Sequence, residues 1–95
     1  MKITEVKVFP AREGGRLKAY ATIVFDNCFI VRDLKIIEGH KGLFVSMPSR
    51  KRKDGTFKDV VHPLNADMRE TIEKDVIAAF DLAEKTGQMS SPEEY

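Results

Sequence analysis

The apolar residues change their spacing near residue 65, and this change constrains the fold more than any other feature of the chain. From Leu17 to Phe25 the odd-numbered positions are apolar, which is typical of a β-strand with one buried face. Later in the chain, apolar residues recur at steps of three and four, which is typical of an α-helix with one apolar stripe. The stripe consists of Met68, Ile72, Val76, Ala79, Phe80 and Ala83. The sequence therefore predicts several strands followed by one helix.

Turn-forming residues divide the N-terminal part into five predicted strands. Gly14-Gly15, Asp26-Asn27 and the loop 38–42 separate the first four. Pro48 is expected to end the fourth, because proline has no N–H to donate to a sheet. Arg32-Asp33 is expected to form a bulge or kink within the third strand. The predicted strands cover residues 4–10, 17–25, 28–37, 43–47 and 57–61.

The predicted helix has recognisable ends. Asn65 is a suitable N-cap, and Gly87 suits the position after the last helical turn. Ile77 lies beside the apolar stripe, where it either widens the core face or contacts a second copy; we favour the first interpretation. We therefore expect an α+β fold, with an antiparallel sheet of about five strands and one long C-terminal helix packed on one face. A single domain is expected over residues 1–87, followed by a polar tail over 88–95.

Composition excludes some classes of protein. With 42% hydrophobic and 33% charged residues, the chain is typical of a folded globular protein. It has no apolar stretch long enough to span a membrane and no signal-peptide core at its start. We therefore expect a cytoplasmic protein that does not bind membranes. The single cysteine, Cys28, cannot form an internal disulfide, and its apolar neighbours predict that it is buried.

The net charge of +1 is distributed unevenly along the chain. Residues 1–27 carry a net charge of +2, residues 28–62 carry +4, and residues 63–95 carry −5. A basic body with an acidic C-terminal segment suggests an anionic partner for the basic part. The same asymmetry would also allow the basic body of one copy to meet the acidic segment of another.

Four consecutive cations, Arg50, Lys51, Arg52 and Lys53, precede the turn signal Asp54-Gly55. This pattern predicts a β-hairpin with the four cations at its tip. Like charges on one tip repel each other, and a polyanion such as a phosphate backbone would relieve that repulsion. The alternative is a lysine-rich tip that keeps the sheet soluble and its edge unpaired.

The residues that could perform catalysis are few and scattered. His40 lies in a Gly-flanked loop, where exposure is expected, and His62 precedes Pro63, where it could bond a backbone group. Neither histidine has a second ligand at the spacing of a zinc site. Nucleophile-elbow, P-loop and dinucleotide motifs are missing from the sequence. We therefore predict that the protein is not an enzyme and has no cofactor, metal site or small-molecule substrate.

Several segments together resemble the SpoVG family, the stage V sporulation protein G family. They are Val8-Phe9-Pro10, Leu17 to Ala21, Phe25 to Phe29, the stretch EGHKGLFVSMPSRK from Glu38 to Lys51, and HPLN from His62 to Asn65. The resemblance covers the chain from Lys2 to Lys85. It departs from the family pattern at Arg32, where many members have His, and at Val61, where a smaller residue is common. These departures leave the nucleic-acid preference open.

The resemblance implies a small bacterial regulator linked to septation and sporulation. Proteins of this family are similar in binding DNA and RNA, in forming homodimers, and in having an antiparallel sheet followed by a helix. The resemblance thus implies DNA or RNA and a second copy of the chain as partners. The alternative function is a protein-interaction module of the division apparatus that does not bind nucleic acid.

The expected contacts with nucleic acid centre on the basic run. Its cations would bind phosphates, and Arg50 or Arg52 could instead reach a guanine edge. Phe44 or Phe57 could stack on an unpaired base if exposed. Arg69 is a weaker candidate, because acids surround it on the helix. The predicted nucleic-acid-binding residues are Ser49, Arg50, Lys51, Arg52, Lys53, Lys41 and Lys58, with Lys35 as a further extension of the footprint.

Overall fold

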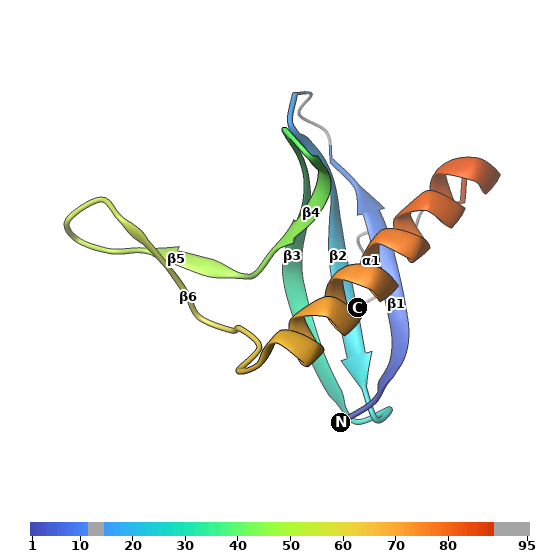
Figure 1. The fold of residues 1–95 in the computed structure, drawn as a ribbon, viewed down its shortest axis with the longest axis horizontal. Helices are drawn as coiled ribbons and strands as arrows, with labels where there is room; N and C mark the ends of the chain where they lie inside the picture. Colours follow the sequence, from blue (N-terminus) through green and yellow to red (C-terminus); the bar gives the residue numbers. More distant parts are fainter. Residues whose placement is uncertain (12–14, 89–95) are drawn as a thin grey trace.

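The computed structural model describes residues 1–11 and 15–88. These residues form a four-stranded antiparallel sheet in the order β1-β2-β3-β4, a separate two-stranded ribbon of β5 and β6, and one helix, α1, which crosses one face of the sheet (Figure 1). The elements are β1 (Ile3–Pro10), β2 (Leu17–Phe25), β3 (Phe29–Gly39), β4 (Gly42–Ser46), β5 (Ser49–Lys51), β6 (Phe57–Asp59) and α1 (Ala66–Thr86). The α+β fold predicted from the spacing of apolar residues is confirmed.

The core lies between the sheet and the helix. The alternating residues Ala19, Ala21, Ile23 and Phe25 of β2 are buried, as predicted. On β3 the buried residues are Val31, Leu34 and Ile36, and the first two are three positions apart. The pairing register with β2 shifts between these two, and Asp33 between them has a φ of 65°. The predicted bulge is therefore present, and it keeps all three side chains on the helix-facing side.

The helix has the predicted ends and the predicted buried stripe. The Asn65 side chain accepts a hydrogen bond of 2.8 Å from the Met68 N–H, which satisfies one of the unpaired donors of the first turn. Gly87 has a φ of 70°, a left-handed conformation that glycine adopts without strain. Ile77 is partly buried and packs against the core, so it widens the core face. The buried stripe consists of Ile72, Val76, Phe80 and Ala83.

The fifth predicted strand lies outside the main sheet. β6 pairs with β5, which follows Pro48, and the two form a ribbon of their own. Between Ser49 and Asp59 the sequence contains one apolar residue, Phe57. A strand pair without alternating apolar residues has no face to bury against a helix, so the ribbon gains nothing from joining the core.

The predicted burial of Cys28 is wrong. The residue is exposed, and its N–H donates a 3.0 Å hydrogen bond to the carbonyl of Phe25. Asp26 and Asn27 between them both have a positive φ, as in the tight turns that join antiparallel strands. Cys28 therefore belongs to the β2–β3 turn, and the apolar residues that follow it belong to the next strand. The predicted polar tail lies outside the described residues, apart from the exposed Gln88.

Candidate nucleic-acid interface

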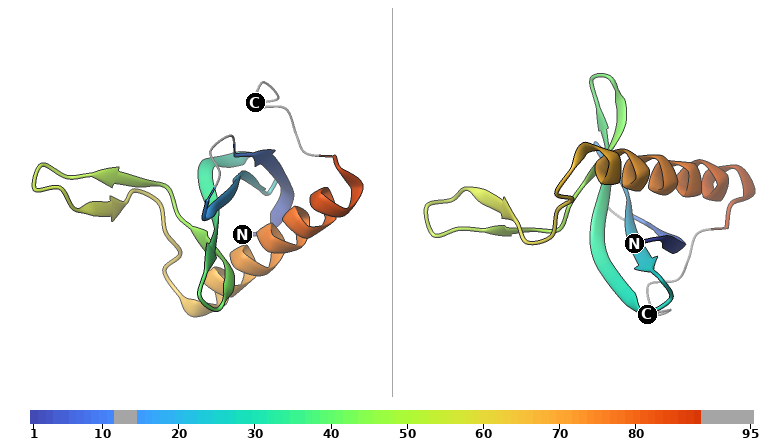
Figure 2. Two further views of the ribbon diagram at one scale, coloured as in Figure 1. Left: turned by 90° about the horizontal axis from the view of Figure 1, so that it is seen from above. Right: turned by 60° about the horizontal axis from the view of Figure 1, so that its bottom comes forward.

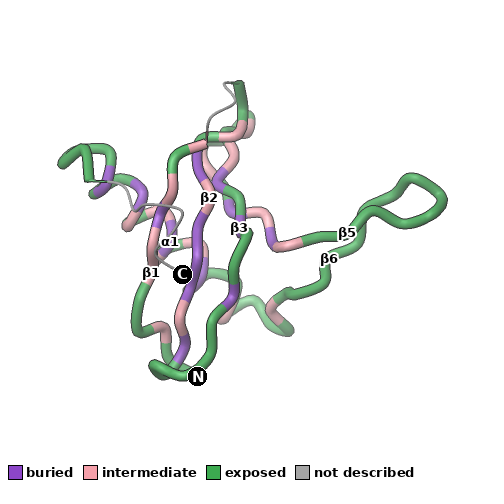
Figure 3. Tube along the Cα trace, turned by 180° about the vertical axis from the view of Figure 1, so that it is seen from behind, coloured by how far each residue is buried: buried purple, intermediate pink, exposed green. Residues whose placement is uncertain are grey.

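The chain from Pro48 to Val61 forms a projecting segment, which we name the arm. It leaves the body at the end of β4 and returns just before α1, so it extends well beyond the sheet and helix (Figures 1 and 2). Every residue of the arm from Ser49 onwards is exposed, and these residues belong to the longest run of exposed residues, 49–62, in the described part of the chain (Figure 3). The arm therefore presents its side chains to solvent on both faces.

Backbone hydrogen bonds extend the arm's ladder at both ends. At the base, the Val60 N–H donates to the Pro48 carbonyl at 2.8 Å. Near the tip, the Arg52 N–H donates to the Thr56 carbonyl at 2.6 Å. The central pairs are Ser49 with Asp59, Arg50 with Lys58, and Lys51 with Phe57. The predicted hairpin is thus present, but Arg50 and Lys51 lie in its strand β5 rather than at its tip. The register fixes which side chains lie together.

The tip is held by the turn residues that the sequence indicated. The Gly55 N–H donates to the Arg52 carbonyl at 3.0 Å, and Gly55 has a φ of 91°, which a residue with a side chain rarely adopts. Asp54 Oδ1 accepts hydrogen bonds from the Thr56 hydroxyl at 2.7 Å and from the Thr56 N–H at 3.0 Å. These two bonds, the hydroxyl foremost, lower the pKa of Asp54 below its ordinary value. Its carboxylate is therefore engaged within the turn.

The register divides the arm into two different faces. Side chains of directly opposed residues in an antiparallel pair lie on the same face, and alternate residues along a strand share that face. Arg50, Lys58 and Arg52 therefore lie on one face, which we name the basic face. Lys51 and Phe57 lie on the other face, together with the Ser49–Asp59 pair.

The arm carries uncompensated positive charge. It has five cations and two carboxylates, a net charge of +3. Arg50 lies directly opposite Lys58, a like-charge pair that weakens a ribbon. Within the described residues, none of the five cations forms an ion pair with a carboxylate. An arm with this arrangement has an electrostatic reason to bind a polyanion.

The structure brings most, though not all, of the predicted site residues together. Ser49 and the basic run lie on the arm, as does Lys58. Lys41 lies in the β3–β4 turn, at the far end of β4, on the order of 20 Å along the strand from Pro48. Lys35 pairs with Ser46, so it lies closer to the base of the arm than Lys41 does.

The other candidates from the sequence are distributed over the body. Phe44 is 42% exposed and lies on β4, whereas Phe57 is 70% exposed and lies on the arm itself. Arg69 is exposed on α1, beside the acidic Glu70. His40 is exposed as predicted, and His62 Nδ1 lies 3.0 Å from the Pro63 carbonyl oxygen, the backbone contact expected for it.

The described residues offer neither a metal-binding cluster nor a membrane-spanning helix. Within residues 1–11 and 15–88, no group of three or more histidine, cysteine, aspartate or glutamate side chains is placed to hold a metal ion. The one helix in this part of the chain is too polar to cross a lipid bilayer.

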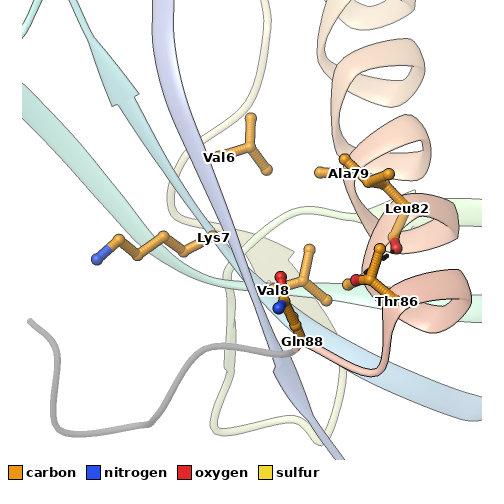
Figure 4. Close-up of a pocket in the computed structure, with 8 residues that line it drawn as sticks. Val6, Lys7, Val8, Ala79, Leu82, Thr86 and Gln88 are labelled. Carbon is orange, nitrogen blue, oxygen red and sulfur yellow. Dashed lines mark hydrogen bonds between the residues drawn. The ribbon is translucent and has the colours of Figure 1, made fainter.

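A second surface feature lies on the opposite side of the body from the arm. A shallow groove of about 250 Å³ runs between β1 and the C-terminal half of α1 (Figure 4). Val6, Val8 and Ala79 line it, and Leu82 at its rim is 64% exposed. Among the described strands β1 is an edge strand with β2 as its single neighbour, and the groove lies along it.

Comparison with known families identifies the chain. The family model of SpoVG matches residues 1–82. The chain belongs to the SpoVG family. It is 60% identical over 81 residues to the "Putative septation protein SpoVG" of Bdellovibrio bacteriovorus, covering 85% of this chain and 74% of the relative. It is 56% identical over 87 residues to the protein of the same name from Anaeromyxobacter sp. strain K, covering 92% and 85%.

A more distant relative matches over a similar length. The "Putative septation protein SpoVG" of Clostridioides difficile is 51% identical over 83 residues, covering 87% of this chain and 90% of the relative. The family resemblance found in the sequence is therefore confirmed. The name of these SpoVG relatives refers to septation and specifies neither a ligand nor a site. The arm residues thus stay predictions from sequence and geometry.

Proposed function

We propose that this SpoVG-family protein is a DNA- or RNA-binding bacterial regulator linked to septation and sporulation, and that it acts as a homodimer. The observation that carries the proposal is the arm, whose five cations project from the body and form no ion pair with a carboxylate of the described residues. The names of the relatives support the link with septation. The family resemblance supports the homodimer, which would present two arms to one nucleic acid.

The arm would supply affinity through phosphate contacts. Lysine and arginine side chains that neutralise phosphates release condensed counterions, so affinity falls as salt rises. If the four cations of the basic run neutralise four phosphates of duplex DNA, the logarithm of the association constant falls with the logarithm of salt at a slope of about −3.6 per arm. Such contacts carry no sequence information, although an arginine of the basic face could also read a guanine edge.

The test compares salt-dependent binding of two variants with the wild type. The first replaces Arg50, Lys51, Arg52 and Lys53 with alanine. The second replaces four exposed cations of the body, Lys2, Arg16, Lys74 and Lys85, with alanine. The two variants therefore have the same net charge. Random duplex DNA and single-stranded RNA serve as probes. We expect the arm variant to lose most of the salt slope and the body variant to keep it, with both retaining the wild-type circular dichroism spectrum.

Equal slopes for the two variants would contradict the proposal, because net charge rather than the arm would then determine binding. The homodimer is checked separately by light scattering coupled to gel filtration. We expect twice the mass of one chain, and a monomeric mass would refute this part of the proposal.

The second candidate function is a protein-interaction module of the septation apparatus. The groove beside β1 favours it, because an edge strand and an apolar groove together suit an extended protein segment. The Leu82→Asp variant separates the two functions, since it places a charge in the groove and leaves the arm intact. It should weaken binding of a protein partner and leave nucleic-acid binding unchanged. The absorbance ratio at 260 over 280 nm of the purified protein is a simpler discriminator. With no Trp and two Tyr, the protein absorbs weakly at 280 nm, so bound nucleic acid raises the ratio clearly.

A further inference from the structure

Phe57 is the one apolar residue between Ser49 and Asp59, and 70% of its surface is exposed. It does not belong to the hydrophobic core or to the partly buried residues packed against it. An aromatic ring in this position gains little from folding, because most of its surface stays in water. Packing within one copy of the chain therefore does not account for an aromatic residue at this place.

The ring is exposed to solvent and lies beside an ammonium group. Lys51 lies directly opposite Phe57 on the same face of the ribbon. Gly55, two positions earlier at the tip, has no side chain that could cover the ring. The remaining pair on this face is Ser49 with Asp59, and the Asp59 carboxylate lies on the side of the ring away from the tip. Phe57 thus presents a flat apolar surface beside an ammonium group.

We propose that Phe57 is a stacking platform for an unpaired base, so that the arm binds single strands more tightly than duplexes. This inference rests on the proposed function and adds the class of nucleic acid that the arm selects. Every base has a π-face, and stacking on an aromatic side chain does not depend on its identity. While one base stacks on Phe57, Lys51 contacts a phosphate of the same strand. In a duplex the bases are already stacked on each other, and the ring has no free base to cover.

The charge around the ring favours a nucleic acid over an apolar protein segment as its occupant. An apolar partner would have to bury Phe57 next to Lys51 and close to the cations of the tip, which would remove their hydration without compensation. Each nucleotide of a polynucleotide strand carries both a base, which can stack on the ring, and a phosphate, which can bind a cation. A second copy of this chain that covers Phe57 is the competing occupant, and the test includes it.

The experiment uses Phe57→Trp as a reporter and Phe57→Leu as the loss variant. Because the sequence has no tryptophan, the introduced indole is the sole source of tryptophan fluorescence. We expect oligo(dT) and oligo(U) to quench it on binding, and a duplex of equal length to leave it nearly unchanged. We expect Phe57→Leu to weaken single-strand binding roughly tenfold. Duplex affinity and the salt slope should stay at wild-type values.

The control is Phe29→Leu, which removes a ring of similar exposure, 63%, from the main sheet. Equal weakening by both leucine variants, equal losses on single strand and duplex, or an unquenched indole would each overturn the inference. If Phe57→Leu changes the number of copies in the assembly, as judged by its mass in solution, the inference is overturned too, since the ring would then lie between two copies. If the basic-run alanine variant loses its salt slope while Phe57→Leu binds normally, the proposed function stands and the stacking role fails. Wild-type slopes in that alanine variant would refute the proposed function itself.

Discussion

The like-charge pair of Arg50 and Lys58 allows one substitution to move arm stability and nucleic-acid affinity in opposite directions. The two residues are directly opposed on the basic face, within the spacing at which cross-strand pairs interact. Lys58→Glu turns a repulsive pair into an attractive one. In an exposed ribbon, where solvent screens the charges, this change stabilises the paired state of the arm by about 0.5 kcal/mol. That corresponds to a roughly twofold decrease in the population of the opened arm.

The same substitution removes one cation from the proposed phosphate-binding surface. If Lys58 neutralises a fifth phosphate in addition to the four of the basic run, the salt slope rises to about −4.5 per arm, and affinity falls about 500-fold between 50 and 200 mM salt. With four contacts left, the slope is about −3.6 and the decrease is about 150-fold. Lys58→Gln should show the same slope as Lys58→Glu. The glutamate variant should bind more weakly, because its carboxylate also repels the phosphates.

Two measurements on the same variants check this prediction. Hydrogen exchange by NMR reports arm opening through the Arg52 and Val60 amides, which donate to Thr56 and Pro48 across the ribbon. Titration of duplex DNA at several salt concentrations reports the slope. Slower exchange with a shallower slope is the expected result for Lys58→Glu. An unchanged slope would refute the placement of Lys58 in the phosphate-binding surface, and faster exchange would refute the cross-strand register.

Three further predictions concern the turn, the helix and the core. Thr56→Ala removes the hydroxyl that donates to Asp54, so it should raise the pKa of Asp54 towards its ordinary value, as measured by an NMR pH titration. Because the pKa of Asp54 is lowered in the folded arm, its contribution to tip stability is complete above the ordinary carboxyl pKa. This contribution is lost as the pH falls through the lowered pKa of the folded arm. Asn65→Ala should destabilise the protein by about 1 kcal/mol in urea unfolding, and Asn65→Asp, which preserves the cap, should not. Ile36→Ala should cost about 2–5 kcal/mol in the same assay, because Ile36 is fully buried. The same replacement of its neighbour Ile37, which is only partly buried on the opposite face, should lower the free energy of unfolding clearly less.

The sequence predicts most of the body because each part has a local signal. The alternation in β2 and the stripe in α1 set which faces are buried, and Asn65 and Gly87 mark the helix ends. The bulge in β3 was also predictable, since Val31 and Leu34 share a face only if an extra residue lies between them. These signals act over a few residues, so they can be read without knowledge of the tertiary structure.

The position of the arm was harder to predict because it depends on what the strands pack against. The sequence indicated a hairpin at Asp54-Gly55. Whether β6 pairs with the main sheet or with β5 alone, however, depends on tertiary packing and not on a local signal. The signal that favours a separate ribbon is the lack of alternating apolar residues between Ser49 and Asp59. Cys28 was misplaced for a similar reason. Its apolar neighbours suggested burial, whereas the two left-handed residues before it place it in a turn.

The energetics of the arm connect its structure with its proposed role. A ribbon of two short strands gains little stability by itself, and this one places Arg50 against Lys58 and leaves Phe57 in water. In one copy of the chain, these features reduce the stability of the arm and contribute nothing to the core. A polyanion with accessible bases would compensate for both, because phosphates neutralise the cations and a base covers the ring. The arm should therefore be more ordered when bound than when free, and amide exchange along β5 and β6 should slow on binding of a single strand, while exchange in the core of β2 stays constant. Faster or unchanged exchange in the arm under saturating nucleic acid would show that binding occurs elsewhere on the molecule.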